Sequence, residues 1–311
     1  DRFTVRGDVR VDSADPIRVA GEQVIAGPVE TSYINAGRLV IKPGGVLTQH
    51  YTPSSASPER LTIEVDELVI EAGGAIDVST RGYPVRVSYP GHVVPGVWSG
   101  GSHLGEGGIN NGPAGETFGS VVAPQENGGG AYHDSRGGGA VKIVAQRVQI
   151  DGAIRANGQS TRQGGAGGSV WIQTNALAGV GVVEARGANA QWSGEGSGGG
   201  GAISIQYSTL ESGATLLGKL NAQGGSTQVT GGAGTVYVQG GTDSYGELIV
   251  DNKTVGGNRR TILPSLGKGT ARSGSGGATL ATGRATAIPA YFVGHWIEIR
   301  DGATGALEGA W

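Results

Sequence analysis

The sequence predicts an all-β fold, a parallel β-helix in which short strands stack into successive coils. A glycine cluster followed by a short alternating apolar run occurs four times between residues 137 and 252. The runs open at Val141, Val170, Ile203 and Val236, at spacings of 29, 33 and 33 residues. Repetition at a period of this size is typical of proteins whose repeats stack on one another.

The aligned runs place apolar residues in two columns. Side chains alternate between the two faces of a strand, so residues two positions apart face the same way. We therefore expect two buried core columns, one of Val141, Val170, Ile203 and Val236, and one of Ile143, Ile172, Ile205 and Val238. The residues expected to face outward between them are Lys142, Trp171, Ser204 and Tyr237.

Two outward columns are candidate functional features. Gln173, Gln206 and Gln239 share one outward position on three successive runs, which predicts a ladder of hydrogen-bonded side-chain amides. Trp171 and Tyr237 are expected two rungs apart, at ~10 Å, a separation that suits stacking against neighbouring sugars. In the competing interpretation, a long insert elsewhere in the chain covers both rings.

A second strand is expected after each of the first three runs. The segments IRANG, VEARG and LNAQG begin at Ile154, Val183 and Leu220 and align with one another. A coil of about 30 residues is too long for one strand and shows no helical pattern. We therefore expect three short strands per coil, joined by glycine turns.

The chain divides into three regions. Alternating segments before residue 80, including the near copies LVIKPGGVL and LVIEAGGAI, indicate that the β-helix extends over residues 1–252. Residues 82–136 contain five prolines and no regular period, and we interpret them as a long Gly/Pro-rich excursion from one corner, folded over the side of the coils. Residues 253–311 are an irregular segment with C-terminal strands, expected to cap the last rungs or to begin a further unit.

Composition excludes several classes of protein. Of the 311 residues 62 are glycine, without the period of collagen, and the absence of cysteine excludes disulfides and thiolate metal sites. A net charge of −3 with 16% charged residues lacks the clustered basic footprint of nucleic-acid binding. No apolar run is long enough to insert into a membrane. Few charges, many small polar residues and no cysteine are typical of bacterial extracellular proteins.

Several segments resemble the glycine-rich repeats of very large, adhesin-like bacterial surface proteins. The resemblance is carried by IRANG (154–158), GGAGGSVWI (164–172), GGGGAISI (198–205), GGAGTVYV (231–238) and YGELIVDN (245–252). It implies a right-handed β-helix and an extracellular structural or adhesive role. It implies no catalytic residue.

The sequence assigns no catalytic, cofactor-binding or metal-binding residue. Asp77 and Glu184 are expected in one outward column, but Arg155 separates them, whereas a glycosidase needs two carboxylates roughly 5–9 Å apart around one bond. The insert contains His92, His103 and His133, without the spacing of metal ligands. We therefore expect no metal and no cofactor.

The function expected from these features is a non-catalytic structural or adhesive solenoid segment at the cell surface or outside the cell, such as a stalk, adhesin or matrix element. The expected partners are further copies or tandem units joined end to end, and surface polysaccharide. The alternative is a polysaccharide-active β-helix enzyme, a lyase or glycosidase, or a carbohydrate-binding module. No nucleic acid and no membrane insertion are expected.

Overall fold

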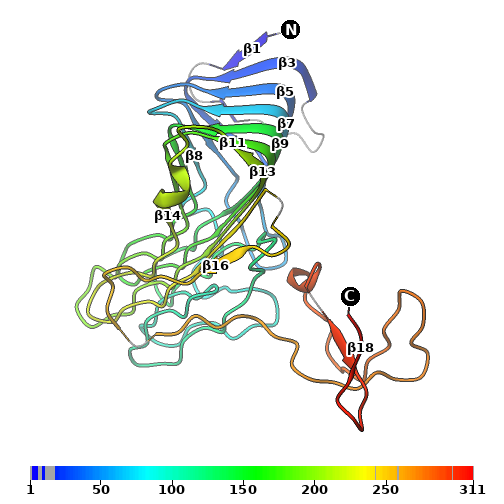
Figure 1. Ribbon diagram of the computed structural model, residues 1–311. Coiled ribbons are helices and arrows are strands. Elements are labelled where there is room, and N and C mark those ends of the chain that lie inside the picture. Colours follow the sequence, from blue (N-terminus) through cyan, green and yellow to red (C-terminus); the bar gives the residue numbers. More distant parts are fainter. Residues whose placement is uncertain are drawn as a thin grey trace.

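The structure is a computed structural model that describes residues 2–5, 9–10, 18–241, 243–257, 259–295 and 297–310. These residues form strands and loops with no α-helix, and the short 3₁₀ turns are η1 (Leu216–Lys219) and η2 (Ala290–Phe292). Consecutive strands alternate between two sheets of parallel strands, which gives a β-solenoid-like arrangement (Figure 1).

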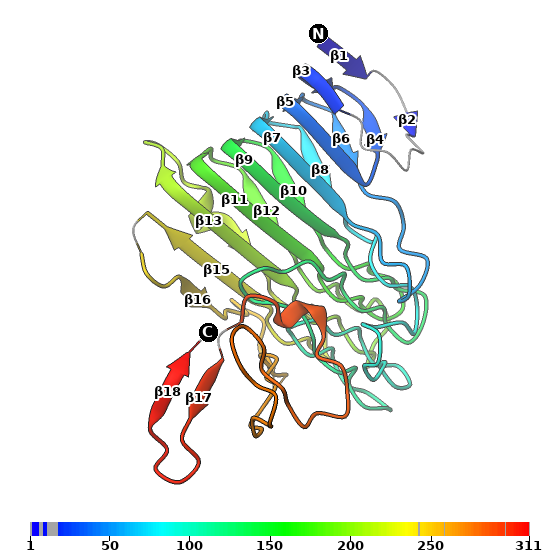
Figure 2. The same ribbon diagram turned by 90° about the vertical axis from the view of Figure 1, so that its right-hand side faces the viewer.

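The longer strands form the first sheet, in which the described residues contribute nine strands. Their order across the sheet is β1 (Arg2–Val5), β3 (Arg18–Ile25), β5 (Tyr33–Ile41), β7 (Leu61–Ile70), β9 (Ala140–Ile150), β11 (Ser169–Ala178), β13 (Ala202–Leu210), β15 (Thr235–Gly240) and β16 (Glu247–Ile249). All neighbours are parallel except β15 and β16, which are antiparallel. Figure 2 shows these strands lying side by side in chain order.

The shorter strands form the second sheet. In the described residues its order is β14 (Leu220–Asn221), β12 (Val182–Glu184), β10 (Ala153–Arg155), β8 (Ala75–Asp77), β6 (Val46–Thr48), β4 (Pro28–Glu30) and β2 (Val9–Arg10). Ile154 pairs with Ile76 on one side and with Val183 on the other, so the second strands of the repeats stack as their alignment indicates.

The core lies between the two sheets, and the pairing register is the one that the repeats predict. One column of directly paired neighbours is Val141, Val170, Ile203 and Val236, and the next is Ile143, Ile172, Ile205 and Val238. Ile143, Ile172 and Ile205 are fully buried in the core. Val238 is only partly buried, because β15 is the last strand of the parallel stack and only the three-residue β16 follows it.

In the coils of β9 to β15 the third side is glycine-rich backbone, and the expected third strand is absent from the described residues. Backbone of the insert 82–136 lies between the glycine clusters of the repeats instead, in the lower part of Figure 1. The N–H of Gly101 donates to the carbonyl of Gly164, and the carbonyl of Gly101 accepts from Gly199, both at 2.9 Å. We call these bonded segments, residues 99–108, 127–138, 164–168, 196–201 and 231–234, the glycine layer.

The glycine layer depends on close approach between backbones. A Cβ at Gly199 would lie 1.9 Å from the carbonyl oxygen of Gly105, and one at Gly101 would lie 2.1 Å from that of Gly129. Neither Gly199 nor Gly101 has a positive φ. Glycine is therefore required here for spacing and not for a turn, and the insert is an integral part of the packed structure.

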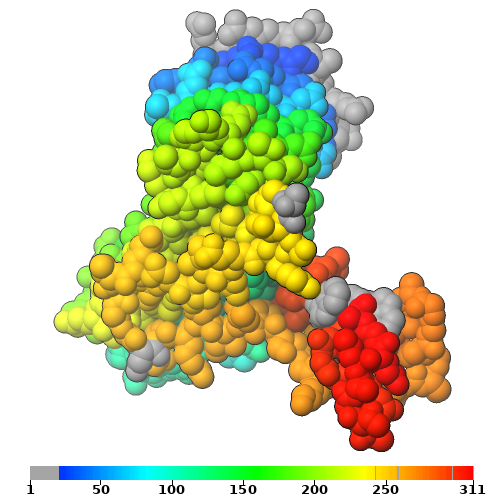
Figure 3. All heavy atoms as spheres, in the orientation of Figure 1, coloured from blue at the N-terminus to red at the C-terminus, as the bar shows by residue number. Residues whose placement is uncertain are grey.

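Part of residues 253–311, the region expected to cap the last rungs or to begin a further unit, lies against the last coil and the insert. Oγ1 of Thr261 donates to the Ala233 carbonyl at 2.7 Å, and the N–H of Ile262 donates to the Leu104 carbonyl at 3.1 Å. The edge of β15 is occupied by β16. Farther along, Tyr291 of η2 packs against Tyr83 and Phe118 of the insert. The hairpin of β17 (Glu298–Arg300) and β18 (Leu307–Ala310) pairs with itself and lies beside the solenoid as a separate arm (Figure 3).

Candidate functional site

The long strands share a bend at which two successive residues face outward. In β9 the exposed Gln146 and the half-buried Arg147 stand between the buried Ala145 and Val148. The pairing of β9 with β11 skips Gln146 and Asn175, and that of β7 with β9 skips Asp66. One extra residue in a strand bends it in the manner of a β-bulge. Here each strand carries the extra residue at the same level, so the register between strands is preserved.

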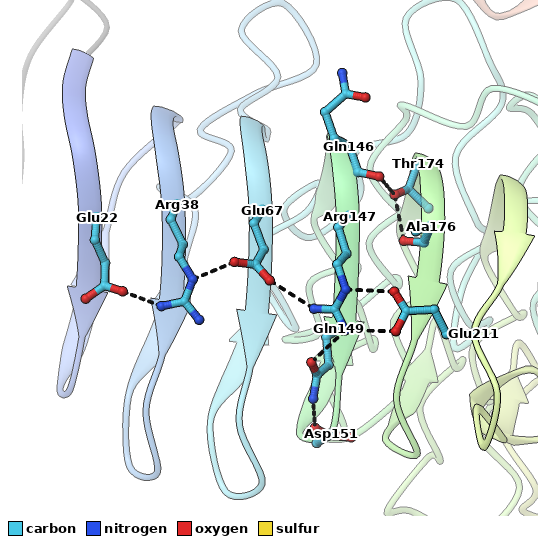
Figure 4. Close-up of polar contacts among 10 residues, drawn as sticks. All are labelled: Glu22, Arg38, Glu67, Gln146, Arg147, Gln149, Asp151, Thr174, Ala176 and Glu211. Atoms are coloured by element: carbon cyan, nitrogen blue, oxygen red, sulfur yellow. Dashed lines mark hydrogen bonds and ion pairs between the residues drawn. The ribbon is translucent and has the colours of Figure 1, made fainter.

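A hydroxyl group supports the bend between β9 and β11. The buried Thr174 places its Oγ1 3.2 Å from the carbonyl oxygen of Gln146 and 3.0 Å from that of Ala176 (Figure 4). The ladder hydrogen bonds are interrupted at the bend, so carbonyl groups there need other partners. Thr174 supplies one donor to them.

The aligned bends form a groove of about 1230 Å³ on the outer face of the first sheet. Its lining includes the bend positions Gly37, Asp66, Gln146, Asn175 and Ser208, together with the outward column Asn35, Glu64, Val144, Gln173, Gln206 and Gln239. The groove therefore follows the stacking direction of the strands. Among the described residues that line it, Glu64, Asp66 and Asp243 are acidic and none is basic.

The three glutamines share one column, but their amides form only part of the predicted ladder. Gln173, Gln206 and Gln239 are register neighbours. Nε2 of Gln173 donates to Oε1 of Gln206 at 3.0 Å. The amide of Gln239 turns away, because its Nε2 donates to the carbonyl of Asp243 and its Oε1 accepts from the Tyr237 hydroxyl. The ladder thus has one link, and its last step is replaced by local contacts at the end of the stack.

The predicted aromatic column does not present two free rings. Trp171 is 9% exposed, Nζ of Lys142 lies 4.5 Å from its ring centroid, and its Nε1 donates to Gln206 at 3.3 Å. The neighbouring Ser204 donates to the carbonyl of Val122 at 2.6 Å, which shows that the insert covers this part of the column.

Tyr237, the other ring of that column, is also engaged within the chain. Its hydroxyl accepts from the N–H of Gly246 at 3.1 Å, and a Cβ at Gly246 would lie 2.3 Å from the ring. Both rings are thus held in contacts within the chain. The insert covers the column near Trp171, as in the competing interpretation, whereas Tyr237 is held by Gly246.

A ladder of alternating charges connects β3, β5, β7 and β9 next to the bend and ends at Glu211, just after β13 (Figure 4). Arg38 pairs with Glu22 on one side and, through Nε at 2.6 Å, with Glu67 on the other. Arg147 pairs with Glu67 at 2.9 Å and, through Nε at 2.7 Å, with Glu211. The pKa of Glu67 lies below its ordinary value. The largest cause is the hydrogen bond from Arg38, and the charge of Arg38 and the interactions with Arg147 also lower the pKa, whereas burial opposes them.

The candidate carboxylate pair is separated as the sequence indicates. Arg155 pairs in register with both Asp77 and Glu184, and its Nε lies 3.6 Å from a Glu184 carboxylate oxygen. The described residues contain no group of three or more His, Asp and Glu side chains that could hold a metal ion. The rings of His92 and His103 both pack against Phe118, at 5.8 and 5.0 Å between centroids, whereas His133 contacts Tyr132, so the insert does not bring all three histidines to one point.

The insert buries an acidic and a basic group near one another. Nδ1 of His103 donates to the Gly167 carbonyl at 2.9 Å, and burial lowers the pKa of His103 to about 4. Burial also raises the pKa of Glu126, although its carboxylate accepts from the N–H groups of Ser120 and Gln125. A Cβ at Gly119 would lie 2.7 Å from Nε2 of His103 and 3.6 Å from Oε2 of Glu126.

Ser120 also lies 3.4 Å from Nε2 of His295, a separation too long for a good hydrogen bond. Ser120 is 1% exposed and its hydroxyl accepts from the N–H of Ala123. This serine is therefore part of the packing of the insert, and a substrate has no access to it.

No family model, curated protein or solved structure matches this chain. In the described residues, no helix has the length and apolar character needed to cross a bilayer. Function is therefore inferred from the geometry of the solenoid and its groove.

The groove residues Asp66, Gln146 and Asn175 were not among the residues singled out from sequence. Their signal is a change of phase in the alternation, with two polar residues in succession in VDEL (65–68) and AQRV (145–148). A bulge is indicated where one extra residue interrupts the alternation of inward and outward residues and the alternation then resumes shifted by one position. The same change at the same distance along successive strands predicts an aligned bend.

Proposed function

We propose that the chain is a non-catalytic structural and adhesive segment of a bacterial cell-surface or extracellular protein, and that its coils wind as a right-handed parallel β-helix. The observation that carries this proposal is the continuous register from β5 to β15, in which each inner strand pairs with a neighbour on both sides. Each rung adds backbone hydrogen bonds and buried aliphatic side chains, which suits a stalk or matrix element. Right-handed crossovers are the rule for parallel strands.

Two sets of contacts that join several rungs support the mechanical part of the proposal. The charge ladder connects β3, β5, β7 and β9 and reaches Glu211 beyond β13. The glycine layer adds bonds from the insert to the repeats, such as Gly105 to Gly200 at 3.0 Å and Gly232 to Glu106 at 2.8 Å. A force that separates two of these rungs must break one or both sets together with the strand ladder.

The long polar groove supports the adhesive part, because a surface protein binds through a face that remains accessible. The alternative, a polysaccharide-active enzyme, would use the same groove. Its carboxylates Glu64 and Asp66 lie on one strand, and Glu64 accepts from the Tyr33 hydroxyl at 2.7 Å. Asp243 follows β15, four strands away from β7.

Two measurements test this function. In single-molecule pulling between the two ends of the chain, we expect the sheet to unfold at a higher force than a helical-bundle reference in the same tether. In an incubation with a panel of neutral and acidic polysaccharides, we expect no new reducing ends and no unsaturated products. Unfolding at the force of the helical reference would contradict the structural role, and product formation would establish the enzyme.

A further inference from the structure

We propose that the groove along the bent sheet binds an extended, neutral polysaccharide whose chain runs parallel to the stacking direction of the strands. This inference rests on the adhesive function proposed above and names the class of ligand that the function would use.

The dimensions of the groove favour a polymer over a small molecule. Its lining extends from Gly21 on β3 to Asp243 just after β15, and its volume is about 1230 Å³. Sites that enclose drug-sized ligands have volumes of roughly 300–1,000 Å³. Neighbouring strands are ~4.8 Å apart, so equivalent outward positions recur at about the length of one sugar in an extended polysaccharide. A repeating ligand can therefore meet the same kind of side chain on successive rungs.

The lining offers hydrogen-bonding groups of both kinds. Oε1 of Gln206 accepts from Gln173 and from Trp171, and Nε2 of Gln206 has no protein partner in the described part of the chain. Oε1 of Gln146 accepts from Nδ2 of Asn175 at 2.5 Å, which fixes these two exposed amides relative to each other. Each sugar hydroxyl both donates and accepts, as amides do. Amides held in place before binding reduce the entropy that a ligand must overcome.

The charges in the groove select against acidic polymers. Its described lining contains Glu64, Asp66 and Asp243 and no lysine, arginine or histidine. The nearby guanidinium groups of Arg38 and Arg147 are each paired with two carboxylates. A polyuronate, with one carboxylate per sugar, would meet like charges along the groove. A neutral sugar avoids this repulsion, and its hydroxyls can donate to the same carboxylates in charge-assisted hydrogen bonds.

Affinity electrophoresis of the whole chain tests the proposal, with gels that contain a neutral glucan, galactomannan or xylan, or polygalacturonate. We expect at least one neutral polymer, but not polygalacturonate, to retard the wild-type chain. The double variant Gln146→Ala, Asn175→Ala should bind that polymer about tenfold more weakly, the effect of losing one or two net hydrogen bonds. The control is Gln191→Ala, since Gln191 is also an exposed amide with one side-chain hydrogen bond, to Ser160, but lies outside the groove.

A second variant tests the charge argument. Asp66→Lys, at an exposed bend position, should increase retardation by polygalacturonate without changing the temperature of thermal unfolding. Retardation by polygalacturonate alone, equal binding by wild type and the double variant, or no retardation by any neutral polymer would each overturn the proposal. These outcomes are separate from the pulling and product assays, so the groove assignment can fail while the structural role stands.

Discussion

A bidentate ion pair joins Arg147 on β9 to Glu211, just after β13, and passes over Ala176 on the intervening strand β11. Nε and Nη2 of Arg147 donate to the two carboxylate oxygens at 2.7 and 2.9 Å (Figure 4). Ala176 is the register neighbour of Arg147, so a long side chain at position 176 would occupy the space that the pair crosses. The small residue lets the charge ladder continue across a strand that contributes no charge to it.

The centre of the ladder predicts a pH-dependent contribution to stability. Glu67 accepts from Arg38 at 2.6 Å and from Arg147 at 2.9 Å, and these contacts lower its pKa from the ordinary 4.5. A carboxyl with a lowered folded-state pKa stabilises the fold above its unfolded-state pKa, and that stabilisation is lost as the pH falls through the folded-state value. Glu67→Gln should therefore reduce the free energy of unfolding by about 1 kcal/mol or less at neutral pH, as for other partly exposed pairs.

Urea denaturation of wild type and Glu67→Gln at neutral pH and well below pH 4.5 checks this prediction. The difference between the two chains should disappear at the acidic pH. Glu247→Gln, at an exposed position of β16, is the matched control and should show no such change. A Glu67→Gln effect that is the same at both pH values would show that lost packing, not charge, is responsible.

The stacked core could be predicted from sequence because it depends on local alternation and on the repeat period. Two apolar residues separated by one outward residue define the inward face of each run, and the spacing of the runs aligns them. Burial fixes that register, because a slip by one residue would turn Ile172 and Ile205 toward solvent. The bend also has a local signal in the adjacent polar residues Gln146 and Arg147, although alternation counted over a whole strand hides it.

Two features could not be predicted in the same way, namely the insert segment that covers Trp171 and the glycine layer. The contacts of both join distant parts of the chain. Ser204 bonds to Val122, 82 residues earlier, and the insert contributes through backbone groups. Glycines carry no side-chain pattern that identifies their partners. Similarly, the amide of Gln239 leaves the ladder because of Asp243 and Tyr237, whose positions depend on how the stack ends.

The core columns predict unequal effects of shortening equivalent side chains. Ile172 is fully buried between strands on both sides, so Ile172→Ala should lower the free energy of unfolding by about 2–5 kcal/mol. Val238 occupies the same column but is only partly buried, so Val238→Ala should cost clearly less. Chemical denaturation of both variants measures the difference. Equal losses would mean that the end of the stack is as well packed as its middle.

The glycine layer predicts that one added methyl group is destabilising at one glycine and tolerated at another. A Cβ at Gly199 would lie 1.9 Å from the Gly105 carbonyl, so Gly199→Ala must separate the insert from the repeat and should cost about 1–3 kcal/mol or more. Gly218 in η1 has open space around the Cβ position, and Gly218→Ala should be neutral or stabilising by up to about 1 kcal/mol. Thermal unfolding of the two variants tests this, and a similar loss in both would contradict the close-approach argument.

Buried His103 predicts that the insert loses stability in mild acid. Its ring packs against Phe118 at 5.0 Å between centroids, its Nε2 has no partner, and burial lowers its pKa from 6.5 to about 4. Between those two values the unfolded chain binds more protons than the folded chain, so stability rises with pH across this window and is lost as the pH falls from 6.5 toward 4. The shift corresponds to a loss of about 3 kcal/mol on acidification.

The variant His103→Gln separates this effect from the other titrating group nearby. Glutamine keeps an N–H donor that can reach the Gly167 carbonyl but does not titrate. Burial raises the pKa of Glu126, so protonation of Glu126 in the folded state acts in the opposite direction and favours the fold in acid. The comparison is therefore made in a Glu126→Gln background, with the free energy of unfolding measured from pH 7 to pH 4. Chains with His103 should show a steeper loss than chains with glutamine at that position, and identical slopes would mean that His103 titrates in the folded protein as it does in the unfolded chain.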